Sequence, residues 1–344
     1  MISNQTLDVV ELTMALCQIP SSTGDEVAVV NYVDTLCKDM GLSTKRQQVG
    51  MLAGRDNVFA FCKSATPSIV LTTHLDTVPP YFSPTLSIDG KTLIGRGVCD
   101  AKGIAAAMIC ALSDLMKSGV TEVGLLFVVG EETDSDGAKA AAAGFLPHVK
   151  YLINGEPTDL KLASSMKGSI VFELETTGKA GHSAYPDSGF SAVHQLNEDV
   201  YKIVNYAWPV HSQFGATTVN IGRFEGGMAA NVIADHAFAK GIIRTTGDAS
   251  QLEAALLGLV SVHTKIKILS SSSPITFAAV AGFETCVVSF GSDVPHLKAM
   301  GEPLLIGPGS IFKAHSDNES IEVSELLEAV RVYKKLCLAV MTMQ

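Results

Sequence analysis

The sequence predicts an α/β protein whose main domain contains a mostly parallel sheet covered by helices. Short apolar runs recur along the chain at Ile69–Leu71, Leu125–Val129, Tyr151–Ile153 and Leu304–Ile306. Runs of this length without polar alternation indicate strands that are buried on both faces. Between the first two runs, an alanine-rich segment near Gly103–Met116 predicts a helix. Helices that alternate with buried strands are typical of a parallel sheet.

Two further helices are expected before the first run, at residues 7–19 and from the polar loop 21–26 to residue 36. The middle of the chain has a different order: strand 169–177, helix 191–206, strands 217–224 and 232–243, helix 249–259 and strand 264–269. This β-α-β-β-α-β order predicts a ferredoxin-like insert. Its small, polar flanks, Ala163–Lys167 and Ser270–Pro274, are predicted hinges. We therefore expect one domain at 1–165 and 273–344, and a second at 166–272.

Composition narrows the class of protein. A chain of 344 residues fits two domains at about 150 residues each. Its net charge of −10 disfavours nucleic acid and anionic membranes as partners. The seven cysteines are scattered and odd in number, which favours reduced thiols. The first twenty residues lack the basic region of a signal peptide, and no apolar stretch is long enough to span a bilayer. We expect a cytoplasmic protein that acts on small molecules.

Each buried run is followed by side chains that bind metals. These are His74 and Asp76, Glu131 and Glu132, Glu156, and His315, with Asp100 in the turn before the alanine-rich helix. Singly, such residues are usually structural histidines, solvated acids or helix caps. Together they meet at the carboxyl edge of one predicted sheet, where the carboxylates would repel one another unless cations neutralised them. Imidazole and carboxylate ligands without thiolate suit Zn²⁺, Co²⁺ or Mn²⁺, and two such ions about 3.5–4 Å apart suit hydrolysis.

Four motifs resemble one known family, the dizinc amidohydrolases, which includes acetylornithine deacetylase, succinyl-diaminopimelate desuccinylase, carboxypeptidase G and aminoacylase. The motifs are His74-Leu-Asp76-Thr-Val-Pro, Gly95-Arg-Gly-Val-Cys-Asp100-Ala-Lys-Gly, Glu131-Glu132 and Gly155-Glu156-Pro-Thr. The resemblance covers essentially the whole chain in order. It implies a phosphorylase/hydrolase-like catalytic domain with an inserted lid and dimerisation domain, and a homodimer that forms through this lid.

The resemblance also implies a role for each ligand. His74 and Glu156 would hold one metal ion, and Glu132 and His315 the other, with Asp100 bridging both. A cis peptide bond is expected at Asp100–Ala101, as is frequent in the family.

Two further acids of these motifs receive roles from the same resemblance. Asp76 would orient the ring of His74 from behind, and Glu131 would be the general base.

The insert is expected to contribute to catalysis as well. Gly181-His182-Ser-Ala resembles the family's lid motif, in which the histidine reaches the partner subunit's site and donates to the oxyanion. Asn231 and Arg244 match positions that bind the substrate carboxylate. The chain departs from the family pattern at Ala234, where proline is usual, and at Ile242, where an acid is usual.

The segment Phe290-Gly-Ser-Asp293-Val-Pro looks closest to acetylornithine deacetylase, which predicts an N-acyl amino acid as substrate and a place in arginine biosynthesis. Asp293 would meet the distal ammonium of the substrate, or bond its own loop. Succinyl-diaminopimelate desuccinylase, and a metallo-carboxypeptidase or dipeptidase of the same family, remain alternatives.

Three other interpretations have less support. Gly95-Arg-Gly97 mimics a dinucleotide fingerprint, but Asp100 replaces its third glycine. Ser164–Lys167 and Ser316–Asn318 match two motifs of penicillin-binding serine acyltransferases, but the third is absent. A metal-free binding protein would have lost its ligands, whereas every expected ligand here is chemically competent.

Overall fold

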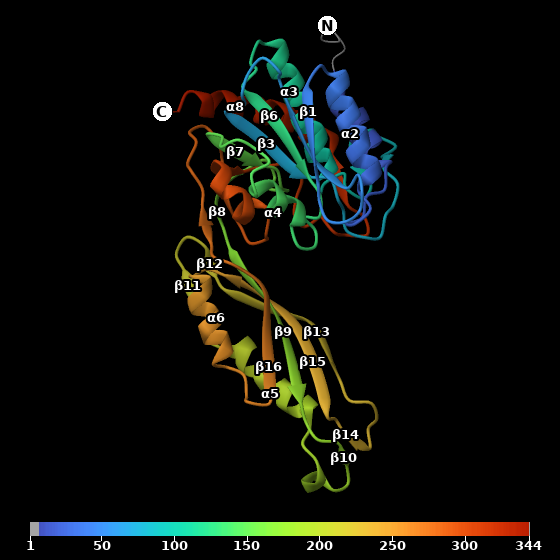
Figure 1. Cartoon of the computed structure of the whole chain (residues 1–344), viewed down its shortest axis with the longest axis vertical. Helices are drawn as coiled ribbons and strands as arrows, with labels where there is room; N and C mark the ends of the chain where they lie inside the picture. The colour runs from blue at the N-terminus through green and yellow to red at the C-terminus, as the bar shows by residue number, and fades with distance from the viewer. Residues whose placement is uncertain (1–6, 344) are drawn as a thin grey trace. The chain divides into compact units, whose positions relative to one another are not determined.

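The computed structural model describes residues 7–343, and these residues divide into two compact units (Figure 1). The first unit contains the chain up to Ser164, Phe277–Cys286 and the chain from Ser292 onward. The second contains Ser165–Thr276 and Val287–Gly291. Residues 287–291, which the sequence analysis assigns to the first domain, therefore cluster with the second unit.

Within residues 7–343, the main sheet of the first unit has six strands. In spatial order they are β1 (Ser43–Gln48), β2 (Asp56–Phe61), β6 (Val123–Val128), β3 (Ile69–His74), β7 (Tyr151–Asn154) and β19 (Glu302–Leu305). β6, β3, β7 and β19 run parallel, and they contain the four buried runs of the sequence. β2 and β1 extend one edge in antiparallel fashion. β1, with the sequence Ser-Thr-Lys-Arg-Gln-Gln, gives no apolar signal because it is an edge strand whose residues are polar and not fully buried.

Helices cover both faces of this sheet (Figure 1). α1 (Val9–Cys17), α2 (Val27–Asp39), α3 (Lys102–Lys117) and α8 (Val323–Met341) contribute to the larger core on one face. α4 (Asp136–Ala142) and α7 (Val294–Leu297) pack with the smaller core on the other. The alanines of α3 are completely buried, and their small side chains let neighbouring helices approach α3 closely. This burial fixes the position of the turn that precedes α3.

Two small three-stranded sheets are also present in the described residues. One contains β17 (Ile275–Thr276), β8 (Leu162–Met166) and β18 (Thr285–Val288); the other contains β20 (Ser320–Glu322), β5 (Thr92–Ile94) and β4 (Thr85–Leu86). The boundary between the two units falls between Ser164 and Ser165, inside the predicted hinge Ala163–Lys167, and most of this segment forms β8. Its small side chains allow a strand to form once two partner strands supply hydrogen bonds.

The main sheet of the second unit has the order β13-β15-β9-β16, and two helices cover it (Figure 1). Along the chain the elements are β9 (Gly168–Thr177), α5 (Ala192–Asn205), β13 (Thr218–Gly226), β15 (His236–Thr245), α6 (Ala249–Leu257) and β16 (Thr264–Ser272). Ile170, Phe172 and Leu174 alternate toward the helices, as period-two burial requires. Short pairs also form between β10 (Gly181–His182) and β14 (Val232–Ile233), and between β11 (Val210–His211) and β12 (Gly215–Ala216).

Two general features accompany this fold. The seven cysteines of the sequence all lie in the described part of the chain and are free thiols. Among residues 7–343, no helix is both long and apolar enough to cross a membrane.

Candidate metal centre

The parallel strands of the first unit bring acids and histidines to one edge. His74 is the last residue of β3, Glu131 and Glu132 follow β6, and Glu156 follows β7. His315 lies in the loop after β19. Because these four strands are parallel, their carboxyl ends meet on the same side of the sheet.

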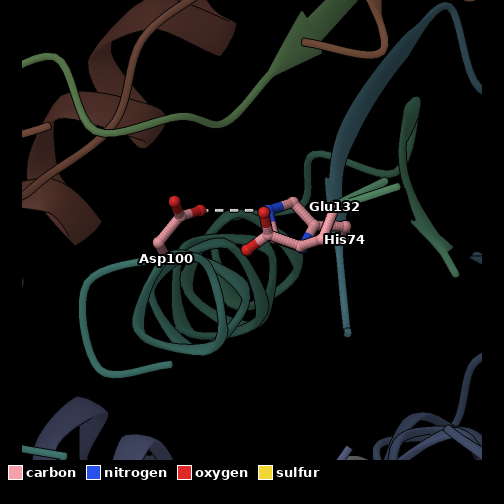
Figure 2. A group of neighbouring side chains, drawn as sticks. All are labelled: His74, Asp100 and Glu132. Carbon is pink, nitrogen blue, oxygen red and sulfur yellow. Dashed lines mark hydrogen bonds and ion pairs between the residues drawn. The ribbon is translucent and has the colours of Figure 1, made fainter. Parts of the chain in front are cut away.

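Asp100 lies between two imidazoles. Its Oδ1 is 3.0 Å from His74 Nε2, and its Oδ2 is 3.3 Å from His315 Nε2. Figure 2 shows Asp100 at the start of α3, facing the side chains of His74 and Glu132. The Asp100–Ala101 peptide bond is cis, as the sequence analysis expects. The two distances show that each carboxylate oxygen of Asp100 faces a different histidine.

The tautomer of His74 leaves a lone pair directed at Asp100. His74 Nδ1 donates to the main-chain carbonyl of Asp76 at 2.9 Å, so in the neutral ring Nε2 carries no hydrogen. Nε2 then faces the Asp100 carboxylate with a lone pair, which is repulsive unless a proton or a cation lies between them. The buried ring is thus preset for a metal ion at Nε2.

His315 pairs with a second carboxylate. Its Nε2 is 2.9 Å from Glu132 Oε2, in addition to its contact with Asp100. The hydrogen bonds with Asp100 and Glu132 raise the pKa of His315 to about 10. The backbone of His315 has φ +60, a left-handed conformation that costs a non-glycine residue about 1 kcal/mol and is frequent at functional sites.

Several carboxylates at this edge lack the partners that burial requires. Glu156 Oε1 and both oxygens of Asp293 are buried without a hydrogen bond. Burial, together with the charge of Glu131, raises the pKa of Glu156 well above its usual range. Burial also raises the pKa of Asp293 to about 7 and that of Glu131 well above normal. Buried acids of this kind are costly unless cations neutralise them.

The donor set fits divalent cations. The ligand atoms of His74, Asp100 and Glu132 lie within 4.8 Å of one another, and His315 contacts two of these three residues. Nitrogen and carboxylate donors without thiolate are the set that Zn²⁺, Co²⁺ and Mn²⁺ accept. Glu156 lies outside this tight group, but its Oε1 is buried without a hydrogen bond and its carboxylate interacts electrostatically with His74.

Asp76 holds the loop of the two glutamates. Its Oδ1 accepts the N–H of Glu131 at 3.1 Å, and its Oδ2 accepts the N–H of Glu132 at 3.1 Å and the hydroxyl of Thr23 at 2.7 Å. The carboxylate lies 3.5 Å from His74 Nδ1, so the main-chain carbonyl of Asp76 is the hydrogen-bond acceptor for this ring. Asp76 therefore fixes the loop of Glu131 and Glu132 through its carboxylate and the ring of His74 through its main-chain carbonyl.

The sequence analysis did not identify Arg96 and Glu319, which lie beneath the Asp100 turn. Both are buried, and Glu319 accepts three main-chain N–H groups from this turn. In the sequence, only two features pointed to these residues: Arg96 lies inside the Asp100 motif, and Glu319 is an acid four residues after His315.

The expected lid residues all lie in the second unit. His182 ends β10, where Ser183 N donates to the carbonyl of Asn231 at 3.1 Å, so these two segments are adjacent. Arg244 lies in β15, paired in register with Ser169 and Thr218. The contribution of these residues to the metal centre remains a prediction.

The sequence of this chain is similar to that of known proteins along most of its length. Residues 70–339 match the model of peptidase family M20/M25/M40. A peptidase M20 domain-containing protein of Schizosaccharomyces pombe is 36% identical over 98% of this chain and 87% of its own length. A probable carboxypeptidase of Emericella nidulans is 36% identical over 94% of this chain and 87% of its own.

The fold has a solved counterpart as well. A tripeptidase from Staphylococcus aureus superposes with a TM-score of 0.82 at 19% identity, covering 96% of this chain and 98% of that one. Since the family model spans most of the sequence and relatives match along nearly all of it, this chain belongs to peptidase family M20/M25/M40 and is a metallopeptidase-type hydrolase.

Proposed function

We propose that this chain hydrolyses the amide bond of a small substrate that carries a free carboxylate beside the scissile bond. One observation above all supports this proposal: a single carboxylate, Asp100, lies between His74 and His315, with further acids around it. His74, Asp100 and Glu156 would hold one cation, and Asp100, Glu132 and His315 a second. Zn²⁺ suits these donors best, with Co²⁺ or Mn²⁺ as substitutes.

Bound divalent ions would polarise the scissile carbonyl and make water a stronger acid. Around them, Glu131 would accept the proton of the attacking water at its carboxylate and return it to the leaving amine. The backbone of Glu131 is held by Asp76, so its side chain starts from a fixed point beside His74 and Asp293.

The substrate is proposed to be an N-acyl amino acid with a cationic side chain, of which Nα-acetylornithine is the simplest example. Asp293 supports this choice. It is buried, both of its oxygens lack a hydrogen bond, and it lies in the electrostatic neighbourhood of the metal ligands. An ammonium group of the substrate would supply the missing partner. A carboxypeptidase is the second candidate, because the Emericella nidulans relative has that name.

The second unit, which the sequence predicts at 166–272, is proposed to be the lid and dimerisation domain. Its His182 would donate a hydrogen bond to the oxyanion in the partner subunit's site, and Asn231 with Arg244 would bind the substrate carboxylate. The planar guanidinium of arginine suits this bidentate task.

A substrate panel tests the proposed function. Protein freed of metal by chelation should be inactive, and Zn²⁺, Co²⁺ or Mn²⁺ should restore amine release from Nα-acetylornithine most strongly. N-succinyl-diaminopimelate, N-acetyl neutral amino acids and dipeptides complete the panel. A maximum on peptides would favour the carboxypeptidase or dipeptidase alternative. Folded protein that binds no metal and hydrolyses none of these substrates would refute the proposal.

Replacement of Glu131 tests the general base. Glu131→Gln should lower kcat by at least about 100-fold with both metal ions retained, because the amide cannot take up the proton. Metal content by elemental analysis and kcat are the two measurements. Asp34→Asn, which changes a buried acid of α2 outside the centre, should leave kcat unchanged. A Glu131→Gln enzyme with near-normal turnover would remove Glu131 from this role.

Replacement of Asp293 tests recognition of the substrate cation. Asp293→Asn should raise KM for Nα-acetylornithine about 10-fold or more, because the ammonium group loses its counterion. The same variant should hydrolyse N-acetylnorvaline, which has the same carbon skeleton without the amine, with an unchanged KM. Equal losses on the two substrates would show that Asp293 acts on the site as a whole.

Mixed dimers test whether His182 acts across subunits. Glu131→Gln and His182→Ala homodimers should each be at least about 100-fold less active than the wild type. A heterodimer of the two variants, co-expressed with different tags, should recover about half of wild-type activity if the histidine serves its partner's site. A heterodimer as inactive as its parents, or a monomeric protein in solution, would contradict this arrangement.

A further inference from the structure

The Asp100 turn is built around the carboxylate of Glu319. Glu319 Oε1 accepts hydrogen bonds from the main-chain N–H groups of Gly97, Cys99 and Asp100, each at 3.0 Å. Its other oxygen, Oε2, accepts a hydrogen bond from Arg96 NH1 at 2.7 Å. The side chain of Glu319 is completely buried, so these four contacts replace all of its hydration.

Arg96 is itself fixed by the surrounding chain. Its side chain is 1% exposed, its Nε donates to the carbonyl of Pro80 at 3.2 Å, and its guanidinium lies over the ring of Phe82. The charge of Arg96 offsets that of Glu319, which would otherwise add a bare anion to a site already rich in acids. The pair therefore serves as a neutral support for the turn.

Glu319 also ties this turn to the segment that carries His315. Gly95 N donates to the main-chain carbonyl of Glu319 at 3.0 Å, and β20 pairs with β5 directly afterwards. His315, four residues earlier, is held in a left-handed backbone conformation. The Asp100 turn and the segment that carries His315 are thus joined by one buried side chain and by the strand pairing next to it.

A carboxylate performs this task better than a neutral group. One oxygen that accepts three N–H groups makes charge-assisted hydrogen bonds, which are about twice as strong as neutral ones. A glutamine of the same shape would keep one acceptor oxygen, but its amide would place N–H groups against Arg96 or against the turn. The turn would then gain freedom at the residue that faces both histidines.

We propose that Glu319 is a positioning residue of the metal centre, which holds Asp100 between His74 and His315 and thereby sets the affinity for cations. This inference rests on the proposed function, since it concerns the same metal centre. Supports of this kind behind metal ligands typically change metal affinity by about 10–100-fold.

The test is a metal titration of Glu319→Gln. The chelated protein is titrated with Zn²⁺ in competition with a chromophoric chelator, and the visible absorption spectrum of the Co²⁺ form is recorded. Circular dichroism establishes that the variant is folded at the temperature used. We expect the affinity of at least one site to fall by about 10–100-fold and the Co²⁺ absorption bands to shift. Asp34→Asn is the matched control, a buried acid paired with Lys38, and should bind both ions as the wild type does.

The titration distinguishes failure of the positioning role of Glu319 from failure of the proposed function. A folded Glu319→Gln variant with both affinities within twofold of wild type and an unchanged Co²⁺ spectrum overturns the inference, whatever its activity. Wild-type protein that binds no metal refutes the proposed function instead.

A second variant covers the case in which Glu319→Gln does not fold. Arg96→Lys keeps the positive charge but loses the planar guanidinium that fixes Glu319 Oε2. A fall in metal affinity of threefold or more in this variant supports the positioning role, and unchanged affinity overturns it.

Discussion

The first unit depends on one constraint: more carboxylates meet at the carboxyl edge of its sheet than can stay ionised together. Asp100 and Glu132 have histidine partners, whereas Glu156 and Asp293 are buried with oxygens that accept no hydrogen bond. In a low-dielectric site such acids either take up protons or bind cations. When the ring of His74 is neutral, its Nε2 lone pair faces Asp100, and a cation between them removes the repulsion. The electrostatic imbalance and the donor geometry thus support the same conclusion, a metal centre.

The fold meets this constraint mainly with main-chain contacts. Asp76 accepts the N–H groups of both glutamates after β6, and Glu319 accepts three N–H groups of the Asp100 turn. Each acid is buried and accepts mainly main-chain N–H groups, so it fixes the path of a loop. Burial of α3 against its neighbouring helices holds the same turn from its other end. The proposed ligands are therefore positioned by well-packed segments, although most of them lie in loops.

The sequence predicted the structure well where strands are buried on both faces. The parallel strands were predictable because strands covered on both faces appear as short apolar runs, and the histidines and acids follow their ends directly. The sequence was uninformative where pairing partners decide the structure. The small, polar segment Ala163–Lys167 gave no strand signal, yet most of it pairs as β8. The polar strand β1 has no apolar pattern and exists because β2 pairs with it.

The sequence by itself determined the family, the α/β class and the set of residues able to bind metal, because these depend on residue types in a fixed order along the chain. The tertiary structure decided how Asp100 faces two histidines, that the carbonyl of Asp76 sets the tautomer of His74, and that Glu319 supports the Asp100 turn. The physical reason is separation along the chain. Glu319 and Asp100 are 219 residues apart, and a hydrogen bond 3.0 Å long between them exists only after the strands and helices have packed.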